Sequence, residues 1–196
     1  MSKLDRRPLI ILALLMATFV VASNFLVQFP IKYFGMEELL TYGAFTYPVT
    51  FLITDLSNRR YGKLVARKIV YFGFILGITL TLIFSTNFSE LISIRIAIGS
   101  GTAFLFAQLL DVQIFDKLRK KTWYVAPFAS SSIGSFVDTF LFFSISFYGT
   151  NLNWITLGLG DFAVKMFLAI IMLIPFKIVM SKLKDVTKYS ADTSSV

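Results

Sequence analysis

Long apolar runs alternate with short polar and basic segments along the whole chain. Six of these runs are close to the ~20 residues that an α-helix needs to cross the hydrocarbon core of a bilayer. They cover residues 8–29, 39–56, 65–85, 91–115, 123–147 and 154–179. The pattern predicts an all-α, polytopic membrane protein, with six transmembrane helices packed in one bundle and a single membrane domain over residues 1–196.

The basic residues are distributed unevenly between the loops that join these runs. Most of the 19 Lys and Arg residues lie in the N-terminal segment, the second loop, the fourth loop and the C-terminal tail. The opposite loops carry Lys32, with Glu37, Glu38 and Glu90 nearby. Cytoplasmic loops of membrane proteins are enriched in Lys and Arg, so both termini are expected in the cytoplasm. Topology therefore explains the net charge of +8, and no direct contact with nucleic acid is expected.

Composition removes several classes of function. The chain is 56% hydrophobic with a mean hydropathy of +0.75, which is too apolar for a soluble domain. It contains no His and no Cys, so Ser-His and Cys-His nucleophiles are absent, as are the commonest metal ligands. We therefore expect no catalytic residue, no metal and no cofactor. A Ser–Lys dyad that uses Lys165, an aspartyl dyad and a purely structural subunit stay as minor alternatives.

Two aspartates lie in the body of predicted spans. Asp111 shares a helical face with Gln108, and Asp138 follows Ser131 by two turns on a stripe of small and hydroxyl residues. A carboxylate inside a membrane is costly and usually faces the bundle interior at a functional site. Both aspartates and Gln108 are therefore candidate substrate ligands, whereas Ser131 is also compatible with close helix packing.

Three further features bear on such a site. Arg95 lies near the outer end of the fourth span, where it either extends to the interface or balances a buried aspartate. Pro48, next to the candidate aromatic ligand Tyr47, interrupts the second span, as in a simple kink or a broken helix at a transport site. Asp161 and Lys165 are four residues apart in an order that favours a pair within one helix, with a role in the site as the alternative. At the inner end of the second span, Asp55 is expected to pair with Arg59.

The chain resembles the queuosine precursor transporter family, the YhhQ or VUT type of integral membrane proteins. The resemblance is carried by TYPVTFLITDLSNRRYGKLVARKIVYFGF, by RIAIGSGTAFLFAQLLDVQIFDKLRK and by SSSIGSFVDTFLFFSISFYG, which together lie between Thr46 and Gly149. It implies a protein of the bacterial inner membrane that imports 7-cyano-7-deazaguanine, 7-aminomethyl-7-deazaguanine or both. One difference is that Ala126-Pro127-Phe128 stands where the family pattern has Arg-Asn.

The chemistry of such a substrate suggests a hypothesis for its binding. A guanine-like ring offers two N–H donors on one edge, which a carboxylate accepts, and an O6 acceptor to which an amide or arginine donates. One aspartate is expected to accept from that edge and Gln108 to donate to O6, with alternating access through movement of the helices. The main alternative is a substrate-binding subunit that needs a separate ATPase partner. Coupling to protons, facilitated transport and a homodimer all stay open.

Overall fold

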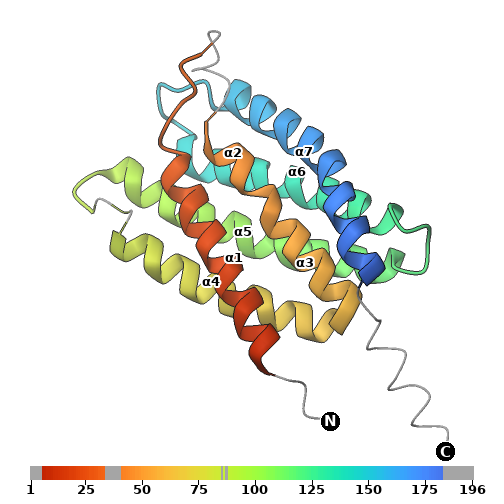
Figure 1. Ribbon diagram of the computed structural model, residues 1–196. Helices are drawn as coiled ribbons and strands as arrows, with labels where there is room; N and C mark the ends of the chain where they lie inside the picture. The colour runs from red at the N-terminus through yellow and green to blue at the C-terminus, as the bar shows by residue number, and fades with distance from the viewer. Residues whose placement is uncertain (1–5, 34–40, 85, 87, 183–196) are drawn as a thin grey trace, which may run out of the picture.

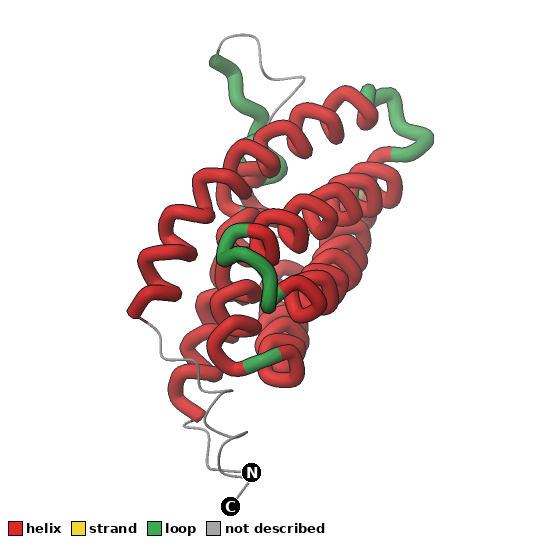
Figure 2. Tube along the Cα trace, turned by 90° about the vertical axis from the view of Figure 1, so that its right-hand side faces the viewer, coloured by secondary structure: helices red, strands yellow, loops and turns green. Residues whose placement is uncertain are grey.

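The structure, a computed structural model, describes residues 6–33, 41–84, 86 and 88–182. Its helices are α1 (Arg6–Leu26), α2 (Gly43–Thr46), α3 (Pro48–Tyr61), α4 (Lys63–Phe84), α5 (Leu91–Leu118), α6 (Val125–Phe147) and α7 (Trp154–Lys182). The tube in Figure 2 shows helices joined by short connections, with no strand in the described ranges. The prediction of an all-α polytopic protein is confirmed.

The second predicted span is divided in two. α1, α4, α5, α6 and α7 are each long and apolar enough to cross a membrane. α2 and α3 instead follow one another, with Tyr47 between them and Pro48 as the first residue of α3. Proline has no N–H with which to continue the hydrogen bonds of a preceding helix. The predicted interruption at Pro48 is confirmed.

α3 ends later than hydropathy predicts. The expected span was 39–56, of which residues 39 and 40 lie outside the described ranges, but α3 continues to Tyr61. Its polar last turns are held by α5: the Asn58 side-chain amide donates to the Val112 carbonyl at 2.9 Å, and Arg59 donates to the Arg119 carbonyl at 2.8 Å. These tertiary hydrogen bonds keep a polar segment helical, and hydropathy does not detect them.

Glycine permits two close arrangements of the backbone. Gly62, at a φ of 83°, is the only residue between α3 and α4, in a conformation that side chains with a Cβ rarely adopt. At Gly43, an added Cβ would lie 2.9 Å from both the Ser23 carbonyl oxygen and the Val27 nitrogen. The start of α2 therefore packs directly against the end of α1.

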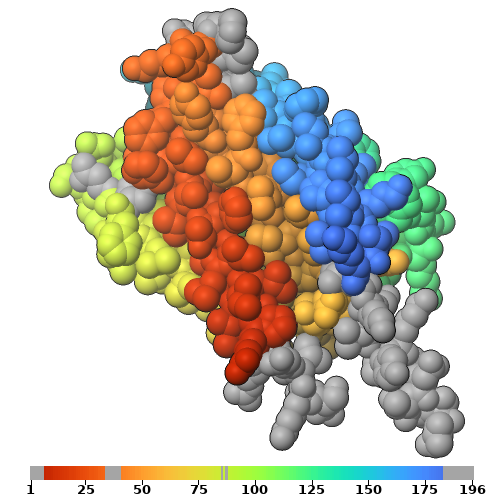
Figure 3. Space-filling model, viewed as in Figure 1, coloured from red at the N-terminus to blue at the C-terminus, as the bar shows by residue number. Residues whose placement is uncertain are grey.

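α3 lies in the middle of the helices. It contacts α1, α4, α5, α6 and α7, and the face seen in Figure 3 shows it between α1 and α7. α1 packs extensively against α4, and α5 against α6. The first residues of α1 and the last residues of α7 lie at the same end of the molecule (Figure 1), as an even number of spans requires.

Apolar side chains cover the outside of the helices. Exposed examples are Ile10, Ile11, Leu14, Phe72, Ile75, Ile170, Ile174 and Ile178. Polar side chains are gathered instead at the interfaces that involve α3, α5, α6 and α7. This distribution is typical of helices that face lipid on the outside and enclose a polar interior.

Candidate functional site

Asp138 on α6 forms the centre of a buried polar network. The Lys165 ammonium on α7 lies 2.8 Å from Asp138 Oδ2, and the Tyr47 hydroxyl donates to Asp138 Oδ1 at 2.7 Å. The side chains of Asp138 and Lys165 are each 4% exposed. Both carboxylate oxygens therefore have a donor from another helix, away from solvent.

Lys165 is held by a second carboxylate as well. Its ammonium pairs with Asp161 one turn earlier on α7, and it donates to the Thr139 hydroxyl at 3.2 Å. Thr139 in turn donates to Asp161 Oδ2 at 2.8 Å. The predicted Asp161–Lys165 pair is confirmed, but the same lysine is also the counter-charge of Asp138. We call Asp138, Lys165, Asp161, Tyr47 and Thr139 the central polar cluster.

The interruption of the second span places Tyr47 in this cluster. Tyr47 lies between α2 and α3, and its ring contacts Phe51 and Phe104 edge-on. The Lys165 ammonium lies 4.9 Å from the centre of the same ring, within the range of a cation–π interaction. Tyr47 thus offers a hydroxyl and an aromatic face at one point of the network.

A small cavity of about 30 Å³ borders the central polar cluster. It is lined by Tyr47, Asp138, Asp161 and Lys165, together with Ser23, Asn24, Val27, Gly43, Ser100 and Phe142. Sites for small molecules usually enclose roughly 300–1,000 Å³. The helices are therefore closed around the cluster, and they must move apart to admit a bicyclic ring.

Gln108 lies in a separate set of contacts from both aspartates. Its amide nitrogen donates to the Thr50 hydroxyl at 2.8 Å, and its oxygen accepts a hydrogen bond from Thr54. These bonds join α5 to α3 and occupy both ends of the amide. A contact between Gln108 and substrate stays a prediction, and it would have to use the second N–H of the amide or displace one of these bonds.

The structure places Asp111 and Ser131 in a second buried group. Ser131 donates to Asp55 Oδ2 at 3.2 Å and Ser130 donates to Asp55 Oδ1 at 3.1 Å. Asp111 is completely buried and lies close enough to Asp55 for the two carboxyl groups to interact. The expected Asp55–Arg59 pair is wrong, because Asp55 turns towards α6 while Arg59 reaches the Arg119 carbonyl.

Arg95 is not placed to balance a buried aspartate. Its guanidinium donates to the carbonyls of Ile145 and Tyr148, which end α6. Carbonyls at a helix C-terminus have no partner within the helix, so a cation there is favourable. The counter-charge of Asp138, which the sequence suggested could be Arg95, is Lys165 instead.

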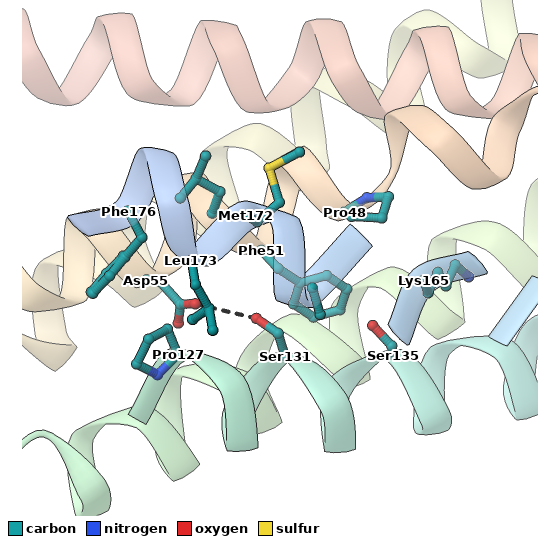
Figure 4. A pocket seen from close by; sticks show the side chains of 12 residues that line it. Pro48, Phe51, Asp55, Pro127, Ser131, Ser135, Lys165, Met172, Leu173 and Phe176 are labelled. Carbon is teal, nitrogen blue, oxygen red and sulfur yellow. Dashed lines mark hydrogen bonds between the residues drawn. The ribbon is translucent and has the colours of Figure 1, made fainter. Parts of the chain in front are cut away.

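Ala126-Pro127-Phe128 belongs to the first turns of α6. Proline fits there, because the first N–H groups of a helix have no acceptor within it. The Pro127 ring lines a cavity next to Asp55 and Ser131 (Figure 4). The segment therefore contributes an apolar wall to the polar interior, where an arginine would add a charge.

Two residues of the interior were assigned other roles from the sequence. The sequence favours a Lys165–Asp161 pair, with a role in the site as the alternative, and an Asp55–Arg59 pair at the loop, whereas the structure places both Lys165 and Asp55 in the buried network. One signal was present: Tyr47, Thr50, Thr54 and Asn58 recur at spacings of three or four and share a polar face of α3. Among the described residues, no group of three or more acidic side chains is arranged to hold a metal ion.

The sequence of the chain is similar to those of known transporters. A family model described as "Putative vitamin uptake transporter" matches residues 41–180. The chain is 36% identical to a "Probable queuosine precursor transporter" of Haemophilus influenzae, over 87% of this chain and 85% of that protein. It is 32% identical to the "Queuosine precursor transporter" of Escherichia coli, over 90% of this chain and 87% of that protein.

A third relative is more distant. The "Probable queuosine precursor transporter" of Bacillus subtilis is 28% identical over 78% of this chain and 76% of that protein. No solved structure matches the chain. The names of the relatives give no support to a subunit that depends on a separate ATPase. With a family model that covers most of the chain and two relatives above 30% identity, the chain belongs to the queuosine precursor transporter family.

Proposed function

We propose that the chain imports 7-cyano-7-deazaguanine, 7-aminomethyl-7-deazaguanine or both, and that the central polar cluster binds the ring. The chain is a multi-pass protein of the bacterial inner membrane and a transporter rather than an enzyme, as its family indicates. The observation that carries the proposal is the buried Asp138–Lys165 pair beside the break between α2 and α3. Charged groups deep in a membrane protein usually serve the transported species.

The cluster has the hydrogen-bonding groups that a guanine-like ring needs. Asp138 can accept from the two N–H groups of the ring edge, and Lys165 can donate to O6. Lys165 takes the role first given to Gln108, because its ammonium already lies 2.8 Å from Asp138. The Tyr47 ring, which borders the same cavity, offers an aromatic face for stacking.

Binding requires the cluster to exchange partners. In the closed structure, Asp138 is satisfied by Lys165 and Tyr47, so the ring must displace at least one of these bonds. The cavity is also too small for the ring until the helices separate. We therefore propose that the substrate enters when the helices open on one side, and that closure around the ring precedes opening on the other.

An uptake assay in cells tests this proposal. The host neither makes the precursor nor has its own importer, and queuosine in its tRNA reports import of precursor supplied at low concentration. The wild-type chain is expected to restore modification. Asp138→Asn replaces a charged acceptor that contributes about 1.5–3 kcal/mol per hydrogen bond, which corresponds to a loss of roughly 10- to 100-fold in uptake.

Asp116→Asn is the matched control, because Asp116 is an acid on α5 whose side chain is 32% exposed and pairs with Arg119. It should transport like the wild type at equal amounts in the membrane. If Asp138→Asn also transported normally, the central polar cluster would not be the binding site. If the well-expressed wild type gave no modification, the substrate assignment would be wrong.

A further inference from the structure

A second pair of buried acids lies apart from the central polar cluster. Asp55 on α3 and Asp111 on α5 are 2% and 0% exposed, and they are close enough to interact electrostatically. Ser130 and Ser131 of α6 donate to the two oxygens of Asp55. Two carboxyl groups and two hydroxyls from three helices therefore meet in the interior.

Acceptor oxygens in this group outnumber the donors. Neither oxygen of Asp111 has a hydrogen-bond partner among the described residues, nor has the side-chain oxygen of Asn58, one turn after Asp55. Asn58 is held in place because its amide nitrogen donates to the Val112 carbonyl, next to Asp111. Buried acceptors without a donor are rare and unfavourable, and a bound water, an ion or a proton can supply what they lack.

Among the described residues, no basic side chain pairs with either of the two acids. The described part of the chain has three ion pairs, and neither Asp55 nor Asp111 takes part in any of them. The other charged side chains that the structure describes on the surrounding helices are Arg7 of α1, Arg59 and Arg60 of α3, Lys63, Arg67 and Lys68 of α4, Arg95, Asp116 and Lys117 of α5, Asp138 of α6, and Asp161, Lys165, Lys177 and Lys182 of α7. Several have other partners: Arg59 donates to the Arg119 carbonyl, Arg67 to Gln113, and Lys165 binds Asp138 and Asp161.

We propose that Asp55 and Asp111 form a proton-binding site, distinct from the central polar cluster, and that the proton bound there is moved together with the substrate. A proton on one carboxyl supplies the missing donor, because its O–H can donate to the other carboxylate. It also removes one of two negative charges that repel each other in a medium of low dielectric constant.

The cavity drawn in Figure 4 joins this site to the central polar cluster. It is lined by Asp55 and Lys165, with Ser131 and Ser135 of α6 one turn apart between them. Its volume is about 10 Å³, close to the minimum for one water molecule. Residues of α7 line it opposite α6, so separation of α7 from α3 and α6 would expose both sites in one movement. This coupling rests on the proposed function, whereas proton binding by the two acids does not.

Infrared spectroscopy of the purified protein tests proton binding without any substrate. A protonated carboxyl has a carbonyl stretch separate from the bands of a carboxylate. We expect the wild type to show such a band, and to lose it as the pH is raised. Asp111→Asn should lack it, because the asparagine amide donates to Asp55 in place of the carboxyl. Asp116→Asn, on the same helix, should keep it. A spectrum that does not change between the wild type and Asp111→Asn would overturn the proposal.

Transport in proteoliposomes tests the coupling. With one proton moved per substrate, a gradient of about one pH unit, acidic outside, sustains roughly tenfold accumulation of labelled 7-deazaguanine precursor. The wild type and Asp116→Asn should reach this level, and Asp111→Asn should not exceed equilibrium. Accumulation driven by a Na⁺ gradient at equal pH would overturn the choice of a proton.

Exchange of labelled for unlabelled substrate at equal pH separates the two proposals. A wild-type protein that exchanges substrate but ignores the pH gradient contradicts the coupling and leaves the proposed function intact. A protein that does not exchange any precursor contradicts the proposed function. In that case the infrared band still decides whether the two acids bind a proton.

Discussion

Charge balance within the central polar cluster determines how individual substitutions act. Lys165 lies between two carboxylates, Asp138 and Asp161, so three charges are buried and one negative charge is in excess. Removing one partner of a buried ion pair is costly when it leaves the other charge without compensation. The lysine is therefore the residue on which the stability of the cluster depends.

Lys165→Met should destabilise the folded protein by about 3–5 kcal/mol, because it leaves two buried acids without a counter-charge. Asp138→Asn should cost much less, since it leaves the neutral Lys165–Asp161 pair in place. Thermal unfolding of the purified proteins in detergent measures both effects. Lys177→Met, on the exposed end of α7 where the lysine covers Trp123, is the control and should unfold close to the wild type. Equal stability of Lys165→Met and the control would contradict the role of Lys165.

The sequence identifies two of the buried acids, Asp111 and Asp138, but not Asp55 and not all of the partners. Asp138 and Asp111 stand out because carboxylates in apolar helices are rare. The Asp161–Lys165 pair follows from a spacing of four along one helix. The Asp138–Lys165 pair depends instead on how α6 and α7 are rotated against each other. The burial of Asp55 and its hydrogen bond from Ser130 depend on which face α3 turns towards α6. Neither relation is encoded in the spacing along the chain.

At the scale of helices, α3 is tied firmly to α5 and more loosely to α7. Hydrogen bonds from Thr54 to Gln108 and from Asn58 to the Val112 carbonyl join α3 to α5. Arg59 and Arg119 also donate to each other's carbonyls at the ends of these helices. α7 meets this part of α3 through apolar side chains around the cavity of Figure 4. We therefore expect α3 and α5 to move together, and α7 to separate from them.

A cross-link between α3 and α7 should stop transport. Leu52 of α3 and Phe176 of α7 line the same cavity, so we expect cysteines placed at positions 52 and 176 to lie within reach of each other. The chain has no cysteine of its own, so a cross-link can form only between the two introduced cysteines.

Oxidation, or a short reagent that bridges two thiols, should abolish uptake in vesicles that carry Leu52→Cys with Phe176→Cys, and a reductant should reverse the effect of oxidation. Each single variant, treated identically, is the control. Full uptake by completely cross-linked protein would show that α7 does not separate from α3.

The order of the helices was predictable, whereas the details of α2 and α3 were not. Long apolar runs gave the positions of α1, α4, α5, α6 and α7 to within a few residues. α3 ends after five further residues because its polar side chains bond to α5, an interaction that hydropathy does not contain. Pro48 was recognised as an interruption, since the absence of its N–H is a local property.

At the scale of the whole molecule, the helices place two sets of loops at opposite ends. The connections α3–α4 and α5–α6 lie at the end where α1 begins and α7 finishes, and the connections α4–α5 and α6–α7 lie at the other (Figure 1). The basic residues of the α5–α6 connection predict that its end faces the cytoplasm. A single domain and a homodimer both stay predictions.

Cysteine labelling in cells should establish the orientation. Asn151→Cys lies in the exposed connection between α6 and α7, and Lys121→Cys lies in the exposed connection between α5 and α6. In cells with a permeable outer envelope, a maleimide that cannot cross the inner membrane should label position 151 at once. Position 121 should react after the membrane is opened, and the native chain should not react at all because it lacks cysteine. The reverse pattern would invert the topology.

The bonds of Asp138 to Lys165 and Tyr47 also bear on what happens after the cargo has been delivered. A carrier that works repeatedly must return empty, and bare charges would make that step slow, since they would have to cross a dry interior. In this structure the groups proposed to bind the substrate, Asp138, Lys165 and Tyr47, are hydrogen-bonded to one another when no substrate is bound. If the central polar cluster binds the substrate, as we propose, the empty carrier is expected to return with a low barrier. Net uptake would then be favoured over an exchange cycle, in which a molecule must be carried in both directions.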